Sequence, residues 1–226
     1  MKKRENGRIS TEKGGAMAQL PETYTTVSRE AHVEFEEKRS LFIGHAIHTT
    51  SEEEALSFVK QLKKQYSDAT HNVYAYHMKG GILARYSDDG EPQGTAGLPV
   101  LETIRKSGVD DVCVVVTRYF GGILLGAGGL VRAYSHSAAI ALEGAGIVTY
   151  EPYVEYELRC GYSEYQKYQA ILATAGAVVD ACDFAADVTV RFAVKRREKD
   201  SLIAKILETG FGRDLPGKIG ERFDYR

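Results

Sequence analysis

The sequence predicts an α+β protein with two domains, and three observations support that fold class. The run Val109–Thr117 is rich in β-branched residues, which is typical of a strand buried on both faces of a sheet. Amphipathic helical patterns occur on both sides of this run along the chain. After Pro152 the pattern becomes strand, helix, strand, strand, helix, strand, which is the ferredoxin-like βαββαβ plan.

The 226-residue chain is long enough for two domains, and the pattern indicates where they divide. We expect a flexible extension over residues 1–23, which are polar and aperiodic, one domain over 24–150, and a ferredoxin-like domain over 151–226. The codons of Lys13-Gly14-Gly15 would resemble a purine-rich ribosome-binding site, so Met17 is a candidate for the true start.

Composition and charge restrict the class of protein. The net charge is −2 and no segment is strongly basic, so a nucleic acid would have to bind through a local patch. Cys113, Cys160 and Cys182 form no C-x-x-C pair and lie in or beside apolar runs, which predicts reduced, buried thiols in a cytoplasmic protein. No apolar run approaches the ~20 residues of a membrane span, and no signal-peptide core follows the start.

The first domain begins with weak alternation at Thr23–Val27 and Ala31–Glu37, which predicts a hairpin pair. A strand follows at Ser40–His48, and Ser51-x-x-Glu54 is a capping box that opens a helix. The later elements are a strand at His71–Met78 paired through Gly80-Gly81 with Ile82–Ser87, a helix from Pro99 to about Lys106 ended by Gly108, the buried strand, a helix at Leu130–Glu143 and a short strand at Ile147–Tyr150.

The second domain has predicted strands at Tyr153–Cys160, Ala177–Phe184, Asp187–Val194 and Lys218–Tyr225, and helices at Ser163–Ala175, with Ser163 as N-cap, and Arg197–Thr209. Its helix-facing residues are Val188, Val190, Phe192 and Val194. Its outer face carries Tyr153, Glu155, Glu157, Arg159, Thr189, Arg191 and Ala193. Because that face is mixed in charge and poor in rings, it does not resemble a surface that stacks RNA bases.

A glycine-rich loop between the buried strand and the next helix is the main candidate site. Its glycines are Gly121, Gly122, Gly126, Gly128 and Gly129. Glycines allow positive φ and close approach, and a helix start presents free amides to an anion. Arg118 precedes the loop, while Arg132 and His136 follow four apart on one helix face. The pattern matches neither the P-loop nor a clean dinucleotide fingerprint.

Each of these residues also has a structural alternative. The glycines could serve only tight strand–helix packing, and Arg118 and Arg132 could form ion pairs with nearby carboxylates instead of holding phosphates. His136 could contact phosphate or carry a proton, although a hydrogen-bonded helix histidine is the more common role.

An acidic loop at Asp88, Asp89 and Glu91 lies earlier in the chain, and we hypothesise that it faces the glycine loop. These carboxylates could bind Mg²⁺, or could be turn-forming acids in a solvated loop. His71 and His77 lack zinc-ligand spacing, so we expect no metal and no cofactor. The run Lys195-Arg196-Arg197 with Lys199 could touch phosphates or simply open a solvated helix.

Four stretches give the chain a specific resemblance. KRSLFI at 38–43, HNVYAY at 71–76, SDDGEPQGTAGLPVL at 87–101 and VTRYFGGILLGAGGLVRAYSHSA at 116–138 resemble the YigZ/IMPACT family. The resemblance covers 24–150 and implies an N-terminal βαβ sandwich like a ribosomal-protein domain and domain IV of elongation factor G. The C-terminal domain would resemble domain V of that factor. Both of these relatives act in contact with ribosomal RNA.

Eukaryotic members regulate translation by competing for the activator of a starvation-responsive kinase. They use an additional N-terminal domain for this, so that mechanism is not carried over. The residues that the resemblance does carry over as candidates are Asp88, Asp89, Arg118, Arg132 and His136.

We therefore favour a cytoplasmic, non-catalytic, translation-linked protein that contacts RNA or ribosome phosphates through the glycine loop and its arginines. One rival is an enzyme acting on a small phosphorylated metabolite or nucleotide with Mg²⁺. It would share a broad superfamily of folds with the GHMP kinases. Another is an interaction module for a translation factor or regulatory protein. The oligomeric state is not predicted.

Overall fold

The computed structural model describes residues 23–78 and 83–225, which form an α+β fold with two sheets, as predicted. One compact unit spans Tyr24–Thr149 and the other runs from Tyr150 onward. The chain passes from one unit to the other within a single long strand, β7 (Ile147–Cys160). The expected flexible extension up to residue 22, the Met17 start and the Gly80-Gly81 turn lie outside the described residues.

The first unit is built on an antiparallel sheet in the order β2-β3-β6-β4-β5. Its strands are β2 (Ala31–Glu37), β3 (Ser40–His48), β4 (His71–His77), β5 (Ala84–Ser87) and β6 (Val112–Tyr119). Strand β6 is central, and its residues 112–118 are all buried. The prediction of a strand covered on both faces is therefore confirmed, although it begins three residues later than expected.

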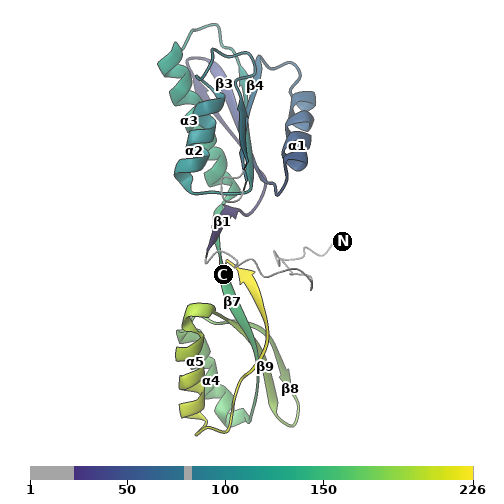
Figure 1. Cartoon of the computed structure of the whole chain (residues 1–226), viewed down its shortest axis with the longest axis vertical. Helices are drawn as coiled ribbons and strands as arrows, with labels where there is room; N and C mark the ends of the chain where they lie inside the picture. The colour runs from purple at the N-terminus through teal and green to yellow at the C-terminus, as the bar shows by residue number, and fades with distance from the viewer. Residues whose placement is uncertain (1–22, 79–82, 226) are drawn as a thin grey trace. The chain divides into compact units, whose positions relative to one another are not determined.

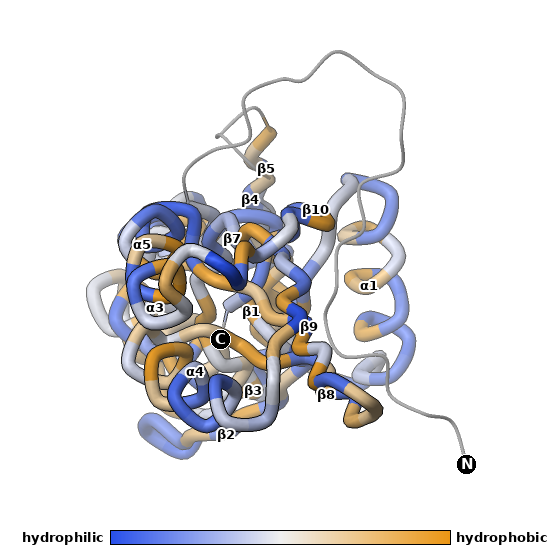
Figure 2. Tube along the Cα trace, turned by 90° about the horizontal axis from the view of Figure 1, so that it is seen from below, coloured by the Kyte–Doolittle hydropathy of each residue, from blue (hydrophilic) through white to orange (hydrophobic). Residues whose placement is uncertain are grey.

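Helices cover both faces of this sheet (Figure 1). Helices α2 (Gly97–Ser107) and α3 (Ala127–Ala145) pack on one face, where the largest core cluster includes Val114. Helix α1 (Glu52–Gln65) packs on the other face, against a cluster that includes Cys113. Figure 2 shows the hydrophobic residues of α1 turned toward the sheet and its hydrophilic residues turned outward.

The predicted hairpin between the first two strands is wrong. Strand β1 (Tyr24–Val27) pairs with β7, whereas β2 pairs with β3 through the turn at Lys38-Arg39. Alternation in a sequence identifies a strand but does not identify its partner, and β1 and β7 lie more than a hundred residues apart in the chain.

The capping box of α1 is confirmed. The Ser51 hydroxyl accepts from the Glu54 amide at 3.2 Å, and the Glu54 carboxylate reaches back to accept from the Thr50 amide at 2.8 Å. At the end of α2, Gly108 adopts the left-handed conformation with φ 69°, as expected for a C-terminal glycine.

The second unit has the predicted βαββαβ order and a sheet in the order β10-β7-β9-β8. Its elements after β7 are α4 (Tyr162–Thr174), β8 (Val178–Phe184), β9 (Val188–Lys195), a short 3₁₀ helix η2 (Arg196–Glu198), α5 (Lys199–Thr209) and β10 (Gly217–Asp224). The predicted helix-facing residues of β9 are all buried, together with Leu172 of α4 and Leu202 of α5. The predicted N-cap Ser163 is wrong, because Gly161 occupies that position.

Ion pairs cross the outer face of this second sheet. Arg191 donates to Glu157 at 2.8 Å, and Arg222 contacts both Glu155, at 3.0 Å, and Asp180, at 2.5 Å. The observed pairing of charges agrees with the mixed face that the sequence predicts, although Tyr153 and Ala193, which were assigned to this outer face, are buried.

The cysteines are free, with Cys113 and Cys160 buried and Cys182 half-buried. Burial, with smaller contributions from nearby carboxylates, raises the pKa of the Cys160 thiol to about 11. Among the described residues, no helix has both the length and the apolar character that crossing a membrane requires.

Candidate anion-binding site

The glycine-rich loop joins the end of β6 to the start of α3 and packs closely on a neighbouring turn. A Cβ at Gly121 would stand 2.0 Å from the Arg39 carbonyl oxygen, so only glycine allows this approach. Gly126, at the N-cap of α3, has φ 73°, a conformation that favours glycine. The glycines therefore place the start of α3 beside the turn between β2 and β3.

The first turn of α3 presents its amide groups without a side-chain cap. The first bond within the helix runs from the Leu130 amide to the Gly126 carbonyl at 2.9 Å, and no side chain of the described residues caps the preceding amides. Ala127 and Gly128 are exposed. An uncapped helix start with exposed residues attracts an anion through its amides and its dipole.

Arg132 adds a positive charge at the same place. Its Nη1 atom lies 3.6 Å from the position that a Cβ on Gly128 would occupy, so the guanidinium folds back over the first helical turn. No hydrogen bond or ion pair to Arg132 occurs within residues 23–78 and 83–225. The ion-pair alternative for this arginine therefore has no support in the structure.

Arg132 also lines a pocket of about 220 Å³ between α3 and the β2–β3 turn. Its lining residues are Phe35, Glu37, Lys38, Leu125, Gly129, Arg132, Ala133 and His136. The rings of His136 and Phe35 meet edge to face with centroids 4.8 Å apart. Lys38 brings a second cation, so two cations and one carboxylate surround the pocket.

Arg118 points elsewhere. It is buried, and its Nη1 donates to Glu91 Oε1 at 2.6 Å while its Nη2 donates to Ser40 at 3.3 Å. Its guanidinium carbon also lies 5.5 Å from the centre of the Phe120 ring. Of the two alternatives for Arg118, the structure supports the ion pair, and this arginine is not available to an external phosphate.

Glu91 of the acidic loop contacts the two elements that flank the glycine loop, through Arg118 of β6 and Tyr134 of α3. Tyr134 donates to Glu91 Oε1 at 2.7 Å, and burial, followed by the charge of Glu91, raises the pKa of the tyrosine well above its usual range.

The two aspartates of this loop have their own structural partners. Asp88 accepts from the amides of Gly94, at 2.9 Å, and Gly97, at 2.8 Å, and so organises the start of α2. Asp89 accepts from Lys63 at 2.5 Å and from the Asn72 amide at 2.6 Å. Within the part of the chain that the structure describes, no group of three or more acidic, histidine or cysteine side chains could hold a metal ion.

Comparisons with known proteins identify the family and agree with the fold. The profile of the Impact N-terminal domain matches residues 38–142, and a domain of unknown function, DUF1949, matches residues 158–213. The IMPACT family member YigZ of Escherichia coli K12 is 36% identical over 178 residues, which cover 77% of this chain and 87% of that protein. This chain belongs to the IMPACT family.

Other IMPACT family relatives match more locally. The family member YvyE of Bacillus subtilis 168 is 46% identical over 127 residues, covering 56% of this chain and 58% of that protein. Protein IMPACT of Oryctolagus cuniculus is 38% identical over 96 residues, which cover 40% of this chain and 30% of that protein. A crystal structure of a hypothetical protein is 33% identical, covers 89% of this chain and 99% of that one, and superposes with a TM-score of 0.56.

Three polar residues of the pocket belong to the region that IMPACT proteins share. Lys38, Arg132 and His136 all lie within the matched Impact N-terminal domain. Sequence reasoning named Arg132 and His136 but missed Lys38 as a site residue, although Lys38 opens one of the four stretches that carry the resemblance. Lys38 and Arg39 have φ values of 48° and 65°, and this tight turn directs the chain toward α3.

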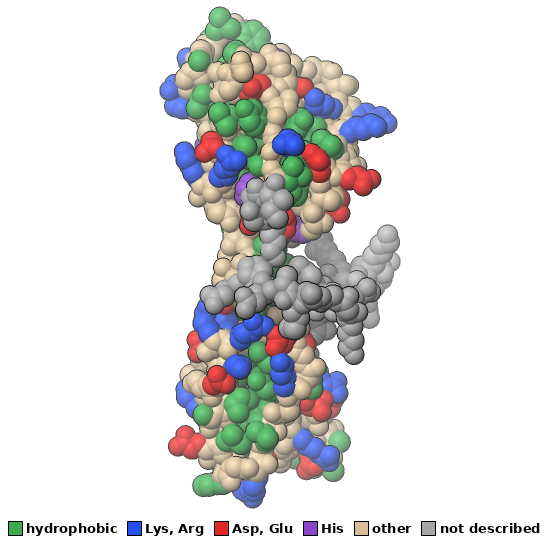
Figure 3. Space-filling view, in the orientation of Figure 1, with side chains coloured by type: hydrophobic (Ala, Val, Ile, Leu, Met, Phe, Trp, Pro, Cys, Tyr) green, Lys and Arg blue, Asp and Glu red, His purple; other side chains and the backbone are tan. Residues whose placement is uncertain are grey.

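The basic run of the second unit is largely paired. Glu151 contacts Lys195 at 2.8 Å and Arg197 at 3.2 Å, and Arg196 contacts Glu221. Figure 3 shows Lys and Arg side chains interspersed with Asp and Glu on the visible face, without one large basic field. The structure therefore favours the solvated helix start over a phosphate contact for this run.

Proposed function

We propose that this IMPACT protein is a non-catalytic, translation-linked binding protein that contacts RNA phosphates on the ribosome through the start of α3. The observation that carries the proposal is the guanidinium of Arg132 folded over uncapped helix amides. Amides, dipole and guanidinium all favour a negatively charged oxygen at one position. Lys38 extends the positive surface across the adjoining turn.

The translation link rests on the family. Eukaryotic members of the IMPACT family regulate translation, and the resemblance also implies domains of a kind that contacts ribosomal RNA. The likeness to elongation factor G, the cytoplasmic location and the RNA or protein partner are part of this proposal.

Salt-dependent sedimentation with ribosomes tests the proposal. We expect the full chain to co-sediment at low salt and to be released steeply as salt rises, because phosphate contacts release counterions. The double variant Lys38→Ala/Arg132→Ala should bind at least tenfold more weakly and should lower the slope of log affinity against log salt by about 2.

A matched control separates the site from the overall charge. Lys60→Ala/Lys64→Ala removes two exposed cations from α1, far along the chain from the pocket, and should bind as the wild type does. Equal sedimentation of the wild type and the Lys38→Ala/Arg132→Ala variant would refute the proposal.

The structure gives less support to an enzyme of small phosphorylated substrates than to a binding protein. The pocket of about 220 Å³ is smaller than the ~300–1,000 Å³ usual for small-molecule sites, and the three acidic-loop carboxylates are engaged by protein groups. A thermal-shift panel of nucleotides and sugar phosphates with Mg²⁺ tests this alternative. A specific ligand would raise the melting temperature as its concentration exceeds its Kd.

A specific observation keeps the protein-interaction alternative as a second candidate. The glycine loop exposes Phe120, Ile123 and Leu124, with Leu124 81% exposed. Exposed apolar side chains gathered on one loop are typical of an interaction surface. The variant Leu124→Asp tests this alternative in two binding assays, one with intact ribosomes and one with protein-free ribosomal RNA. Loss of binding to ribosomes together with unchanged binding to the free RNA would support a protein contact.

A further inference from the structure

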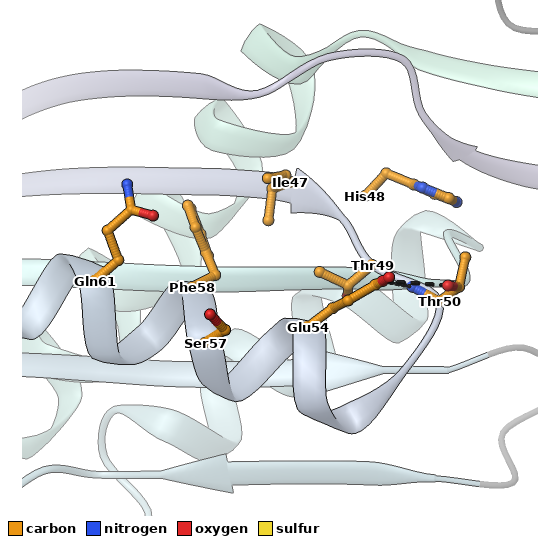
Figure 4. A pocket seen from close by; sticks show the side chains of 8 residues that line it. All are labelled: Ile47, His48, Thr49, Thr50, Glu54, Ser57, Phe58 and Gln61. Atoms are coloured by element: carbon orange, nitrogen blue, oxygen red, sulfur yellow. Dashed lines mark hydrogen bonds between the residues drawn. The ribbon is translucent and has the colours of Figure 1, made fainter.

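A second pocket lies away from the glycine loop, between the end of β3 and one side of α1 (Figure 4). Its volume is about 450 Å³, within the range of small-molecule sites. It is lined by Ile47, His48, Thr49, Thr50, Glu54, Ser57, Phe58 and Gln61. None of these residues belongs to the proposed phosphate site.

Over the residues that the structure describes, the lining of this pocket includes one carboxylate, Glu54, and no Lys or Arg side chain. Glu54 Oε2 accepts from the amide of Thr50 at 2.8 Å and from its hydroxyl at 3.2 Å, which holds the carboxylate at the pocket edge. The Thr50 amide lowers the pKa of Glu54, so the carboxylate is ionised at neutral pH. The second carboxylate oxygen, Oε1, can accept a further hydrogen bond from a ligand.

His48 presents an acceptor for a related reason. Its Nε2 lies 3.1 Å from the Tyr24 hydroxyl, and that hydroxyl donates its proton to Asp111 at 2.6 Å. The Tyr24 hydroxyl can therefore accept a hydrogen bond from Nε2 of His48, and the tautomer protonated at Nε2 has an acceptor at Nδ1. His48 and Glu54 both line the pocket.

A buried hydroxyl in the pocket wall has no partner. Thr49 is 2% exposed, and its Oγ1 makes no hydrogen bond to any of the residues that the structure describes. Buried polar atoms are almost always paired, so the Thr49 hydroxyl has hydrogen-bonding capacity left for a group that is not part of the chain. The hydroxyl, the carboxylate and the imidazole thus surround one cavity.

The apolar part of the pocket limits the form of the ligand. Phe58 and Ile47 provide hydrophobic surface, and both also pack on the α1 side of the sheet. Ser57 and Gln61 follow Glu54 along one side of α1 and continue the polar edge. A ligand that fits has a charged donor group at one end and an aliphatic stem.

We propose that this pocket binds a small organic cation, an amine or guanidine on a short aliphatic stem. Its charged group contacts Glu54 and the Thr49 hydroxyl, and its stem lies on Phe58 and Ile47. A cationic donor group, an ammonium or a guanidinium, matches a pocket whose described lining has a carboxylate and no Lys or Arg side chain. The site is independent of the phosphate-binding proposal.

Agmatine and 1,4-diaminobutane are suitable probes, with butyrate as a control of similar stem length and opposite charge. Isothermal titration of the full chain at physiological salt should show saturable binding of at least one amine and none of butyrate. Amide chemical shifts should change mainly over residues 47–61. Absence of saturable amine binding, or equal binding of butyrate, would overturn the proposal.

Two variants separate a ligand role from a structural role. Thr49→Val removes the unpaired hydroxyl with little change of shape, so we expect equal or higher thermal stability together with at least a tenfold loss of amine affinity. Glu54→Gln keeps the capping interaction, because glutamine also serves in a capping box, and should weaken amine binding at least tenfold.

The matched control is Glu53→Gln, which removes the neighbouring exposed carboxylate of α1 that does not line the pocket. We expect unchanged amine affinity in this variant. If Glu53→Gln weakens binding as much as Glu54→Gln does, the amine responds to the general charge of the helix start and the proposed site is wrong.

Discussion

The buried pair of Arg118 and Glu91 should contribute more to the stability of the first unit than any surface ion pair. The two side chains are only 6% and 3% exposed, and Nη1 and Oε1 are 2.6 Å apart. Arg118→Ala leaves the Glu91 carboxylate buried with the hydrogen bond from Tyr134 at 2.7 Å and with His71 Nε2 at 3.9 Å. Removing one partner of a buried pair typically costs about 3–5 kcal/mol, so we expect a loss of that size in the free energy of unfolding.

Urea unfolding followed by circular dichroism measures this loss, with the slope of free energy against urea checked for each variant. Arg105→Ala is the matched control, because Arg105 contacts Glu102 at 2.8 Å with both side chains nearly half exposed. Such pairs contribute about 0–1 kcal/mol.

A triple variant tests whether the unpaired charge causes the loss. Arg118→Met/Glu91→Leu/Tyr134→Phe removes both charges and the hydroxyl that donates to Glu91, and should recover most of the stability lost by Arg118→Ala, because no unpaired charge or buried donor remains. A loss below about 1 kcal/mol for Arg118→Ala, comparable to that of Arg105→Ala, would refute the reasoning that burial makes this pair important.

Three further predictions concern the first unit. Burial, aided by a neighbouring histidine, lowers the pKa of His45 from 6.5 to about 4, so the unfolded chain binds more protons between these values. The free energy of unfolding should therefore be unaffected by this titration above pH 6.5 and should fall by up to about 3 kcal/mol as the pH drops to 4. In urea titrations, a His45→Gln variant should lack that part of the pH dependence. In thermal unfolding, Gly121→Ala should lower the stability by more than about 2 kcal/mol, because its Cβ meets the Arg39 carbonyl. Gly122→Ala should lower it by about 1–2 kcal/mol, because its Cβ meets no atom within 4 Å but its φ of 83° is unfavourable for alanine. Asp88→Ala should cost about 2 kcal/mol in the same assay and speed amide exchange at the start of α2, because the amides it accepts from lose their partner.

Local signals in the sequence predicted most of the elements, because each depends on nearby residues. The capping box of α1, the glycine at the end of α2 and the buried run of β6 all correspond to the structure. The partner of β1 was not predictable in this way, since pairing with β7 depends on contacts distant in sequence.

The sequence predicted those residues of the candidate site whose position depends on local signals. Arg132 follows from its position one turn into a helix that starts after glycines. The sequence left two roles open for Arg118, but the two-residue period of a strand favours burial. Val114, Val116 and Arg118 lie on the same face of β6, and the two valines belong to the core cluster under α2 and α3. An arginine that continues such a face needs a buried carboxylate, and Glu91 supplies it.

The two arginines that flank the glycine loop therefore have different roles, and a binding experiment can distinguish them. Arg132 would touch phosphate directly, so its removal lowers both affinity and the salt slope, by about 1 for one contact. Arg118 acts through Glu91 and Tyr134, which hold the loop against α3. Its removal would weaken binding by disordering the loop while leaving the salt slope of the folded fraction unchanged. An equal drop in slope for both variants would mean that Arg118 leaves Glu91 and contacts the phosphates itself.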